Sequence, residues 1–303
     1  MRIGLITQLH GRPGADPPTW NSVRGRAIAA ETTGFDSFVF EDALLLPEDD
    51  SADGCWESFS MAAALAVSTE RLTLGQSVVN APYRSPGLTA KSAETLHEIA
   101  QGRYVLGIGA GNTPDSDYEA FGYPTDKRYS RFAEAIEIIH SLLKKGTVDF
   151  DGEFYSLNHA ELVLRGPGDT GPPINIAAAG SKMLRLVARY GNSWNWWSWD
   201  ETLDEILERV RPIISELEEA CEEVDRDPDT LERTFDLYSI VPPGFSGEGS
   251  GMDQAVTGGP QSISEFILGL QELGISEVRC DLTDKSAEGV EAMQPVVELV
   301  HSA

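Results

Sequence analysis

Residues 173–183 read Pro-Ile-Asn-Ile-Ala-Ala-Ala-Gly-Ser-Lys-Met, a short apolar run that passes directly into a segment with helical periodicity. The same step recurs along the chain and gives eight strand–helix pairs. The strand-like runs begin near Ile3, Ser37, Leu72, Tyr104, Ile174, Ser193, Phe235 and Glu277. The helical segments cover about 20–33, 56–68, 86–101, 128–145, 181–190, 202–223, 261–272 and 286–301. Regular alternation predicts a parallel sheet, and eight units in 303 residues favour one α/β domain over 1–303, a (β/α)8 TIM barrel.

Two stretches depart from the regular spacing. Residues 146–172 separate the fourth helix from the fifth strand and are rich in proline and glycine near their end, so we expect an insertion there. Residues 242–260 follow the seventh strand, are glycine-rich and show no periodicity. In a barrel this loop lies on the catalytic face, which predicts a flexible lid, with a plain surface loop as the alternative.

The composition excludes several classes of function. The chain has 23 basic and 49 acidic residues, a net charge of −26. A protein this acidic repels phosphate backbones and anionic lipids, so neither nucleic acid nor a membrane is an expected partner. Three cysteines without C-x-x-C spacing, and no clustering of His, Asp and Glu, predict that no metal is bound. The longest apolar run, 61–67, is too short to cross a bilayer, and the amino terminus leads into a strand, so we expect a cytoplasmic protein.

Glycines mark the end of the fourth strand, in Gly107-Ile108-Gly109-Ala110-Gly111-Asn112. The dinucleotide fingerprint G-x-G-x-x-G fails here in both registers, which disfavours a Rossmann site. The active site of a TIM barrel lies where its strands end. Glycines at this point allow the backbone to approach a flat ligand closely, and a tight turn is the alternative.

A candidate anion site follows the fifth strand at Ala179, Gly180 and Ser181, where a helix begins. Free N–H groups at a helix start favour a phosphate group. Arg131, at the start of the fourth helix, is a candidate second ligand of that phosphate, with a surface salt bridge as the alternative.

Four tryptophans lie together in Trp194-Asn195-Trp196-Trp197-Ser198-Trp199. Alternation along a strand lets only one pair, 194 and 196 or 197 and 199, face inward. Trp196 is the candidate for an aromatic wall beside a bound ring, and packing in the core is the alternative.

Several short stretches occur in a fixed order: Thr33-Gly34-Phe35-Asp36 with Glu41-Asp42, 74–79 with Arg84-Ser85-Pro86, 102–112, Phe121-Gly122, 131–134, 150–155 and 173–180. Together they resemble the luciferase-like monooxygenase family, TIM barrels that bind FMN or the deazaflavin coenzyme F-420. The resemblance covers nearly the whole chain.

The resemblance implies roles for individual residues. Ser77 and Val78 flank a bulge in the third strand, often a non-prolyl cis peptide, that supports the cofactor ring from behind. Asp42 lies beside the ring, Ala110 to Asn112 line its edge, and Gly180, Ser181 and Arg131 bind the phosphate. Many members carry a catalytic histidine where this chain has Ala43. Proton transfer, if the enzyme needs it, is therefore expected from Asp42, Glu41, His10 or the substrate itself.

These expectations describe a flavin- or deazaflavin-dependent oxidoreductase that exchanges hydride with a small organic substrate or monooxygenates it. The compact, acidic chain favours coenzyme F-420 slightly over FMN. NAD(P)H or a flavin reductase are further candidate partners, and a homodimer is the family-level expectation. One alternative is a non-catalytic or regulatory flavin-binding barrel, which Ala43 permits. Another is a sugar- or phosphate-processing barrel with Glu41 and Asp42 as paired carboxylates, although neighbours on a strand point to opposite faces.

Overall fold

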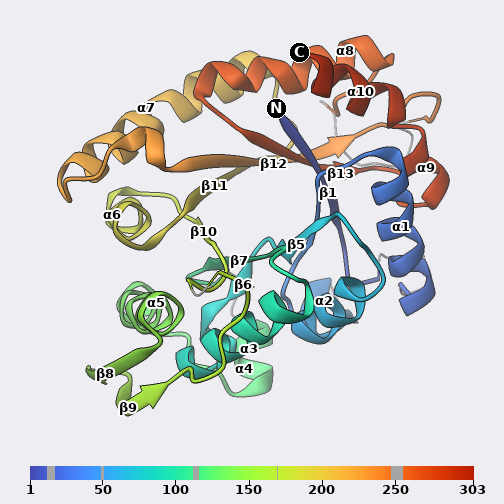
Figure 1. The fold of residues 1–303 in the computed structure, drawn as a ribbon. Helices are drawn as coiled ribbons and strands as arrows, with labels where there is room; N and C mark the ends of the chain where they lie inside the picture. The colour runs from blue at the N-terminus through green and yellow to red at the C-terminus, as the bar shows by residue number, and fades with distance from the viewer. Residues whose placement is uncertain (12–17, 49–50, 112–115, 169, 247–254) are drawn as a thin grey trace.

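The computed structural model describes residues 1–303 except 12–17, 49–50, 112–115, 169 and 247–254. Within these residues, eight parallel strands form a closed barrel, because β10, at one end of the strand order, also pairs with β7. The strands are β1 (Arg2–Thr7), β2 (Ser37–Phe40), β5 (Thr73–Gln76), β7 (Tyr104–Gly109), β10 (Ile174–Ala177), β11 (Ser193–Ser198), β12 (Glu232–Ile240) and β13 (Glu277–Leu282). The predicted (β/α)8 TIM barrel is confirmed (Figure 1).

Helices follow the barrel strands and surround them (Figure 1). They are α1 (Trp20–Thr33), α2 (Ser58–Ala66), α3 (Pro86–Ile99), α5 (Arg128–Lys145), α6 (Ser181–Tyr190), α7 (Leu203–Glu222), α8 (Pro260–Gly269), α9 (Ala287–Glu291) and α10 (Gln294–Ser302). The eight predicted helical segments are confirmed, with the last one divided into α9 and α10.

Local sequence signals set the ends of several helices. Thr19 caps α1, since its side chain accepts the N–H of Ser22 while the Ser22 hydroxyl accepts the N–H of Thr19. Ser85 caps α3, since its side chain accepts the N–H of Leu88, and Pro86 follows it, where a missing N–H costs nothing. Gly146 ends α5 in the left-handed conformation with φ +79°. Short-range capping thus fixes where these helices begin and end.

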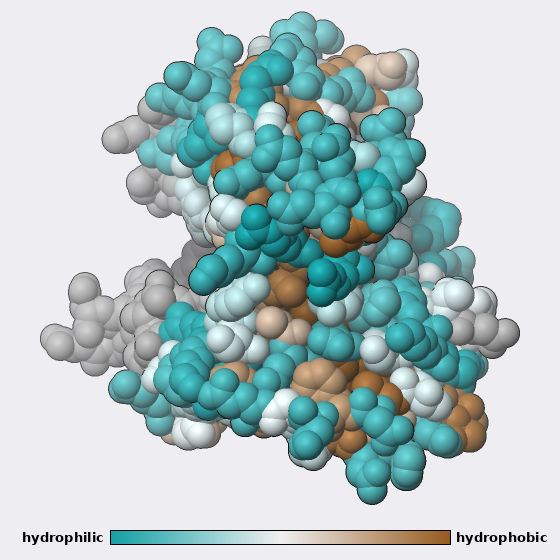
Figure 2. Space-filling view, turned by 90° about the vertical axis from the view of Figure 1, so that its left-hand side faces the viewer, coloured by the Kyte–Doolittle hydropathy of each residue, from teal (hydrophilic) through white to brown (hydrophobic). Residues whose placement is uncertain are grey.

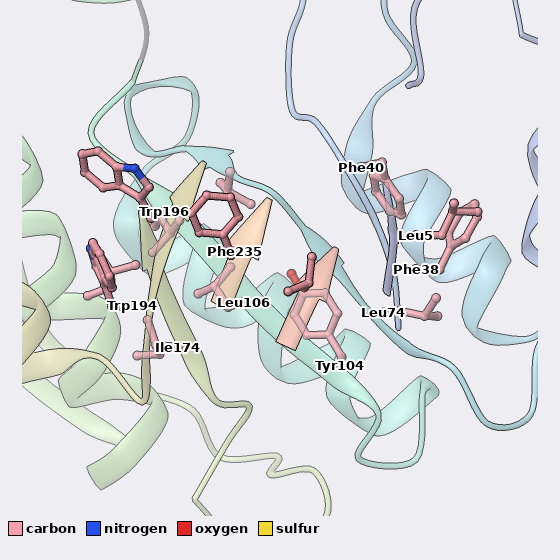
Figure 3. Close-up of a cluster of buried hydrophobic side chains, with 14 of the residues drawn as sticks. Leu5, Phe38, Phe40, Leu74, Tyr104, Leu106, Ile174, Trp194, Trp196 and Phe235 are labelled. Carbon is pink, nitrogen blue, oxygen red and sulfur yellow. The ribbon is translucent and has the colours of Figure 1, made fainter. Parts of the chain in front are cut away.

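The outward faces of the strands carry the apolar core (Figure 3). Phe38, Leu74 and Leu106 are fully buried beneath the helices. Trp194 and Trp196 lie on the same face of β11, with ring centroids 5.6 Å apart. Burial of this layer is the main favourable term for folding.

The inward face of the barrel is polar, where most TIM barrels pack branched apolar side chains. Asn175, Asn195 and Thr234 line its interior. Glycines provide the remaining space. A Cβ at Gly107 would lie 1.9 Å from the carbonyl oxygen of Gln76. The barrel consequently contains two cavities, one at each end of its strands.

The elements outside the barrel were only partly predicted. The hairpin β3 (Leu45–Glu48)–β4 (Ser51–Gly54), the short strand β6 (Val79–Asn80) and helix α4 (Ser116–Phe121) have no counterpart in the sequence prediction. The expected insertion forms the antiparallel hairpin β8 (Thr147–Asp151)–β9 (Ser156–Glu161), which contacts α5. The Glu134 carboxylate of α5 accepts the N–H groups of the hairpin turn, at Glu153, Phe154 and Tyr155.

Of the expected lid at 242–260, residues 247–254 lie outside the described residues. On its described return segment, Val256 pairs with Ile240 in a parallel bridge at the end of β12. The lid itself stays a prediction.

The molecular surface in Figure 2 is mostly hydrophilic, with hydrophobic patches that are separate from one another. This agrees with the acidic composition. Across the described residues, no helix has both the length and the apolar character that a membrane span requires.

Candidate functional site

A cavity of about 340 Å³ opens at the carboxyl ends of the barrel strands. This volume lies within the range of small-molecule sites. Its lining comes from the segment that follows β5 and from the ends of β7, β10, β11 and β12, together with α6. The lining residues are Ser77, Val78, Asn80, Gly109, Ala110, Gly111, Ala177, Ala179, Met183, Asn195, Trp197, Trp199, Asp236 and Tyr238. We call it the carboxyl-end cavity.

Backbone forms one wall of this cavity. The peptide bond between Ser77 and Val78 is cis, as the family resemblance implied. Opposite it, a Cβ at Gly109 would lie 3.0 Å from Val78 Cγ2, and one at Gly111 would lie 2.5 Å from the Tyr118 hydroxyl. Glycine is required at position 111 because its φ is also positive, +101°. Asn112, predicted to line the same edge, lies outside the described residues.

Aromatic rings form another wall. Trp199 stacks on Tyr238 with centroids 3.7 Å apart and planes 6° apart, and Trp197 lies on the same face of β11. Burial raises the pKa of Tyr238 well above 10, and Asp236 and Asp281 raise it further, so its hydroxyl keeps its proton at neutral pH. Trp196, the predicted wall residue, is buried on the other face of β11, because alternate residues of a strand point to opposite sides.

The floor of the cavity is a network of polar side chains. Asp236 forms an ion pair with Arg279, with 2.7 Å between Oδ1 and Nε. The other oxygen of Asp236 accepts hydrogen bonds from Ser77 Oγ at 2.5 Å and Asn195 Nδ2 at 2.9 Å. Both charged side chains are at most 5% exposed.

The start of α6 lies at the rim of the cavity. Gly180 has φ +81°, and a Cβ there would meet nothing within 4 Å, so the space in front of the helix is open. No side chain of the described residues caps α6, which leaves its first N–H groups available. The ammonium group of Lys182 lies 5.7 Å from the centroid of the Tyr129 ring and adds positive charge to this helix start. The Ser181 hydroxyl instead donates to Glu216 at 2.9 Å.

Arg131 contacts Phe154 and Asp126. Its guanidinium lies 4.4 Å from the Phe154 ring centroid and 3.1 Å from an oxygen of Asp126. The salt bridge that was the alternative to phosphate binding is therefore formed. A role of Arg131 in phosphate binding stays a prediction.

Asp42 lies outside the lining of the carboxyl-end cavity. Its oxygens accept hydrogen bonds from Arg84 at 2.6 and 2.9 Å, from Ser58 at 2.7 Å and from the Asn80 N–H at 3.0 Å. Arg84 also bonds Glu57 at 2.8 Å. With every lone pair engaged, Asp42 supports the segment that contains Asn80 rather than facing the cavity.

His10 and Glu41 lie together at the ends of β1 and β2. Nδ1 of His10 is 2.9 Å from Oε1 of Glu41, and the same oxygen accepts the Leu9 N–H at 2.5 Å. Both side chains are about one-fifth exposed. Neighbouring Cys55 is no nucleophile, because burial raises the pKa of its thiol and Glu41 raises it further. A histidine held by a carboxylate is an arrangement suited to proton transfer.

The sequence prediction left open whether Trp197 and Trp199 face inward and gave no role to Asn80, Ala177, Met183, Asn195, Asp236 and Tyr238; all of these residues line the cavity. For β11 and β12 a signal was available, since Asn195, Trp197 and Trp199 alternate along one strand, as do Asp236 and Tyr238 along the next. Which face of each strand points into the barrel was the question that the sequence left open. No group of His, Cys, Asp and Glu that could hold a metal occurs among the described residues.

A second cavity, of about 430 Å³, lies at the amino ends of the strands. We call it the amino-end cavity. Three of its charged groups form a cluster: Arg2 lies 2.6 Å from Glu232 and 3.3 Å from Glu277, and Glu277 accepts a hydrogen bond from Ser37 at 2.5 Å. The charges at the mouth of this cavity are thus mostly neutralised before any ligand binds.

Comparison with known proteins places these observations in a family. Residues 1–243 match the luciferase-like monooxygenase family. This chain belongs to that family. It is 39% identical over 163 residues to a 5,10-methylenetetrahydromethanopterin reductase from Archaeoglobus fulgidus, an alignment that covers 51% of this chain and 48% of the reductase.

Two further similarities fit the same family. An F-420-dependent glucose-6-phosphate dehydrogenase from Beutenbergia cavernae is 36% identical over 169 residues, 55% of this chain and 49% of the dehydrogenase. The chain thus spans about half the length of these curated relatives. The structure of an F-420-dependent secondary alcohol dehydrogenase with an F-420–acetone adduct has a TM-score of 0.79, with 19% identity over 99% of this chain and 98% of that one. The last similarity supports the TIM-barrel fold.

Proposed function

We propose that this protein is an oxidoreductase that binds a flavin-type ring, coenzyme F-420 or FMN, in the carboxyl-end cavity. The observation that carries the proposal is the combination of a flat backbone wall at Ser77–Val78 and Gly109 with an aromatic wall at Trp197 and an uncapped helix start at Gly180. A planar ring with a phosphate-bearing chain needs these three features. The bound cofactor would supply hydride transfer to or from a small organic substrate.

The residues present fit such a group. The absence of a side chain at Gly109 and Gly111 leaves room that a Cβ would fill. The N–H groups of Ser181 and Lys182 would hold the phosphate at the positive end of α6. The local positive charge matters because the chain as a whole carries −26. The Glu216 carboxylate, bonded to Ser181, reduces the positive charge at the start of α6. The ammonium group of Lys182 is therefore a necessary part of the proposed phosphate site.

Coenzyme F-420 is the cofactor we favour over FMN. The proposal is supported by the relative at 36% identity, an F-420-dependent dehydrogenase. Reduced deazaflavin reacts poorly with oxygen, so binding of F-420 alone would leave a dehydrogenase or reductase and remove monooxygenation. The homodimer, NAD(P)H or a flavin reductase as partner, and the cytoplasmic location stay predictions of the sequence.

We propose the His10–Glu41 pair, which like Asp42 lies outside the lining of the carboxyl-end cavity, as the group that transfers the proton. Asp42 is engaged by Arg84, and Ala43 stands where many members have a histidine. Glu41 holds Nδ1 of His10 and thereby orients the ring, so that Nε2 is the atom that would move a proton.

Titration of the purified protein tests the proposal. FMN and F-420 are added separately, and cofactor fluorescence is followed. We expect F-420 to bind with a Kd below 100 µM, about −5.5 kcal/mol. Failure of both cofactors to bind in that range would refute the redox function. Binding of a cofactor without turnover of any alcohol, aldehyde or imine substrate would favour the non-catalytic alternative.

A further inference from the structure

The barrel interior contains a buried ion pair that separates its two cavities. Asp236 of β12 lines the carboxyl-end cavity, and Arg279 of β13 lines the amino-end cavity. Their side chains are 3% and 5% exposed and lie 2.7 Å apart. Gly4 on the adjacent strand leaves room for the arginine, since a Cβ there would lie 2.8 Å from Arg279 Cγ. The pair therefore stands between the two cavities, with its negative end toward the proposed ring site.

Neighbouring side chains fix the orientation of this pair. Asn195 bridges it, because its Nδ2 donates to Asp236 at 2.9 Å and its Oδ1 accepts from Arg279 Nη2. Thr234 accepts a longer bond of 3.3 Å from the same Nη2. Both charged side chains are buried and hydrogen-bonded to neutral neighbours, while the Oδ1–Nε contact between them is an ion pair without hydrogen-bond geometry.

The network also determines what Ser77 offers to a ligand. Ser77 Oγ lines the carboxyl-end cavity and donates its proton to Asp236 at 2.5 Å. A hydroxyl has one proton, so toward the cavity Ser77 can present only lone pairs. The floor beneath residues 77–78 therefore presents the Ser77 oxygen to a ligand as a hydrogen-bond acceptor. The Asp236 carboxylate lies behind this oxygen, and the Arg279 guanidinium lies behind the carboxylate.

We propose that Asp236 and Arg279 are positioning residues that set the electrostatic potential at the cofactor ring. This inference rests on the proposed function. Hydride carries two electrons, so a ring that accepts it gains one negative charge. Charges in a low-dielectric interior act over several ångströms with little screening. Asp236 disfavours the reduced ring, and Arg279 behind it offsets most of that effect.

The proposal predicts opposite signs for the two partners. Asp236→Asn leaves a buried positive charge and should raise the affinity for reduced cofactor relative to oxidised cofactor at least tenfold. That ratio corresponds to about 30 mV for a two-electron couple. Arg279→Gln leaves a buried negative charge and should shift the ratio at least tenfold in the other direction. The double variant should return to within threefold of the wild type.

The experiment measures Kd for oxidised and reduced F-420 and FMN by fluorescence, anaerobically, for the full-length protein and each variant. Thermal unfolding identifies variants that do not fold. Arg279→Lys keeps the positive charge and should keep the ratio of reduced to oxidised cofactor affinity. It therefore still provides a test of the role of charge if Arg279→Gln fails to fold. Glu272→Gln, in an exposed pair with Arg211 at 2.8 Å, is the matched control and should change nothing.

A purely structural pair gives a different result. Both single variants would then weaken oxidised and reduced cofactor equally, or shift the ratio in the same direction, and either result overturns the inference. If wild-type protein binds no cofactor, the proposed function falls and the inference with it. If it binds cofactor and the ratio does not move in the variants, only the inference is refuted.

Discussion

The two cavities of this barrel differ in whether their polar groups already have partners within the protein. The amino-end cavity is larger, about 430 against 340 Å³, yet its charged residues are already engaged by partners. The carboxyl-end cavity is smaller and combines a glycine-lined backbone wall, exposed aromatic rings and a helix start without a side-chain cap. Volume alone would select the amino-end cavity, whereas we propose the carboxyl-end cavity as the cofactor site. The difference shows that a binding site is recognised by surfaces and donors that remain available to a ligand.

The largest expected effect comes from filling the carboxyl-end cavity. Ala177→Phe places a ring in the space across from Gly109 and should weaken cofactor binding at least 100-fold, about 2.8 kcal/mol. Fluorescence titration measures it. Thr73→Phe fills the amino-end cavity and is the matched control, with an expected change below threefold. Equal losses from both substitutions would erase the distinction between the cavities.

Replacing His10 should affect turnover and not binding. His10→Asn removes the proposed proton-transfer group but keeps a polar side chain beside Glu41, so we expect kcat to fall about 100-fold with cofactor Kd unchanged. Steady-state kinetics with F-420 and an alcohol series give kcat. His159→Asn is the control, because His159 is exposed on the β8–β9 hairpin. An unchanged kcat in His10→Asn would assign proton transfer elsewhere.

Negative charge at the start of α6 should weaken the phosphate contact. Gly180→Asp places a carboxylate where the phosphate is expected, and we predict about a tenfold higher Kd for cofactor. Gly180→Asn has the same size and the same cost at φ +81°, so comparison of the two variants isolates the charge. If both variants bind cofactor equally, the phosphate lies at another place.

The smallest effect should come from the mouth of the amino-end cavity. Arg2→Gln breaks the pairs that the half-exposed Arg2 forms with Glu232 and Glu277, and should lower the free energy of unfolding by about 0.5–1 kcal/mol. Cofactor affinity should not change. Urea unfolding measures the change in stability, and fluorescence titration measures the cofactor affinity. A lower affinity in this variant would connect the amino-end cavity to ligand binding.

Periodicity and capping signals were sufficient to predict the barrel. The eight barrel strands and eight helical segments begin within three residues of the predicted positions, since each is a local pattern. The β3–β4 hairpin escaped prediction because Pro47 and neighbouring acidic residues lack strand-like alternation.

The site was less accessible to sequence reasoning. Glycines 109 and 111 and the helix start at Gly180 are visible as local signals. The engagement of Asp42 by Arg84, and the pairing of Asp236 with Arg279 across β12 and β13, depend on strand register and tertiary packing. Inward and outward positions of Trp196 and Trp197 could be separated only once that register was known.

The most direct test of the account is a crystal structure of the protein with F-420 or FMN at a concentration well above its Kd. We predict ring density between the Ser77–Val78 wall and Trp197, above Asp236, with the phosphate at the N–H groups that begin α6. Ring density in the amino-end cavity, or a ring in the carboxyl-end cavity whose phosphate lies away from α6, would contradict it.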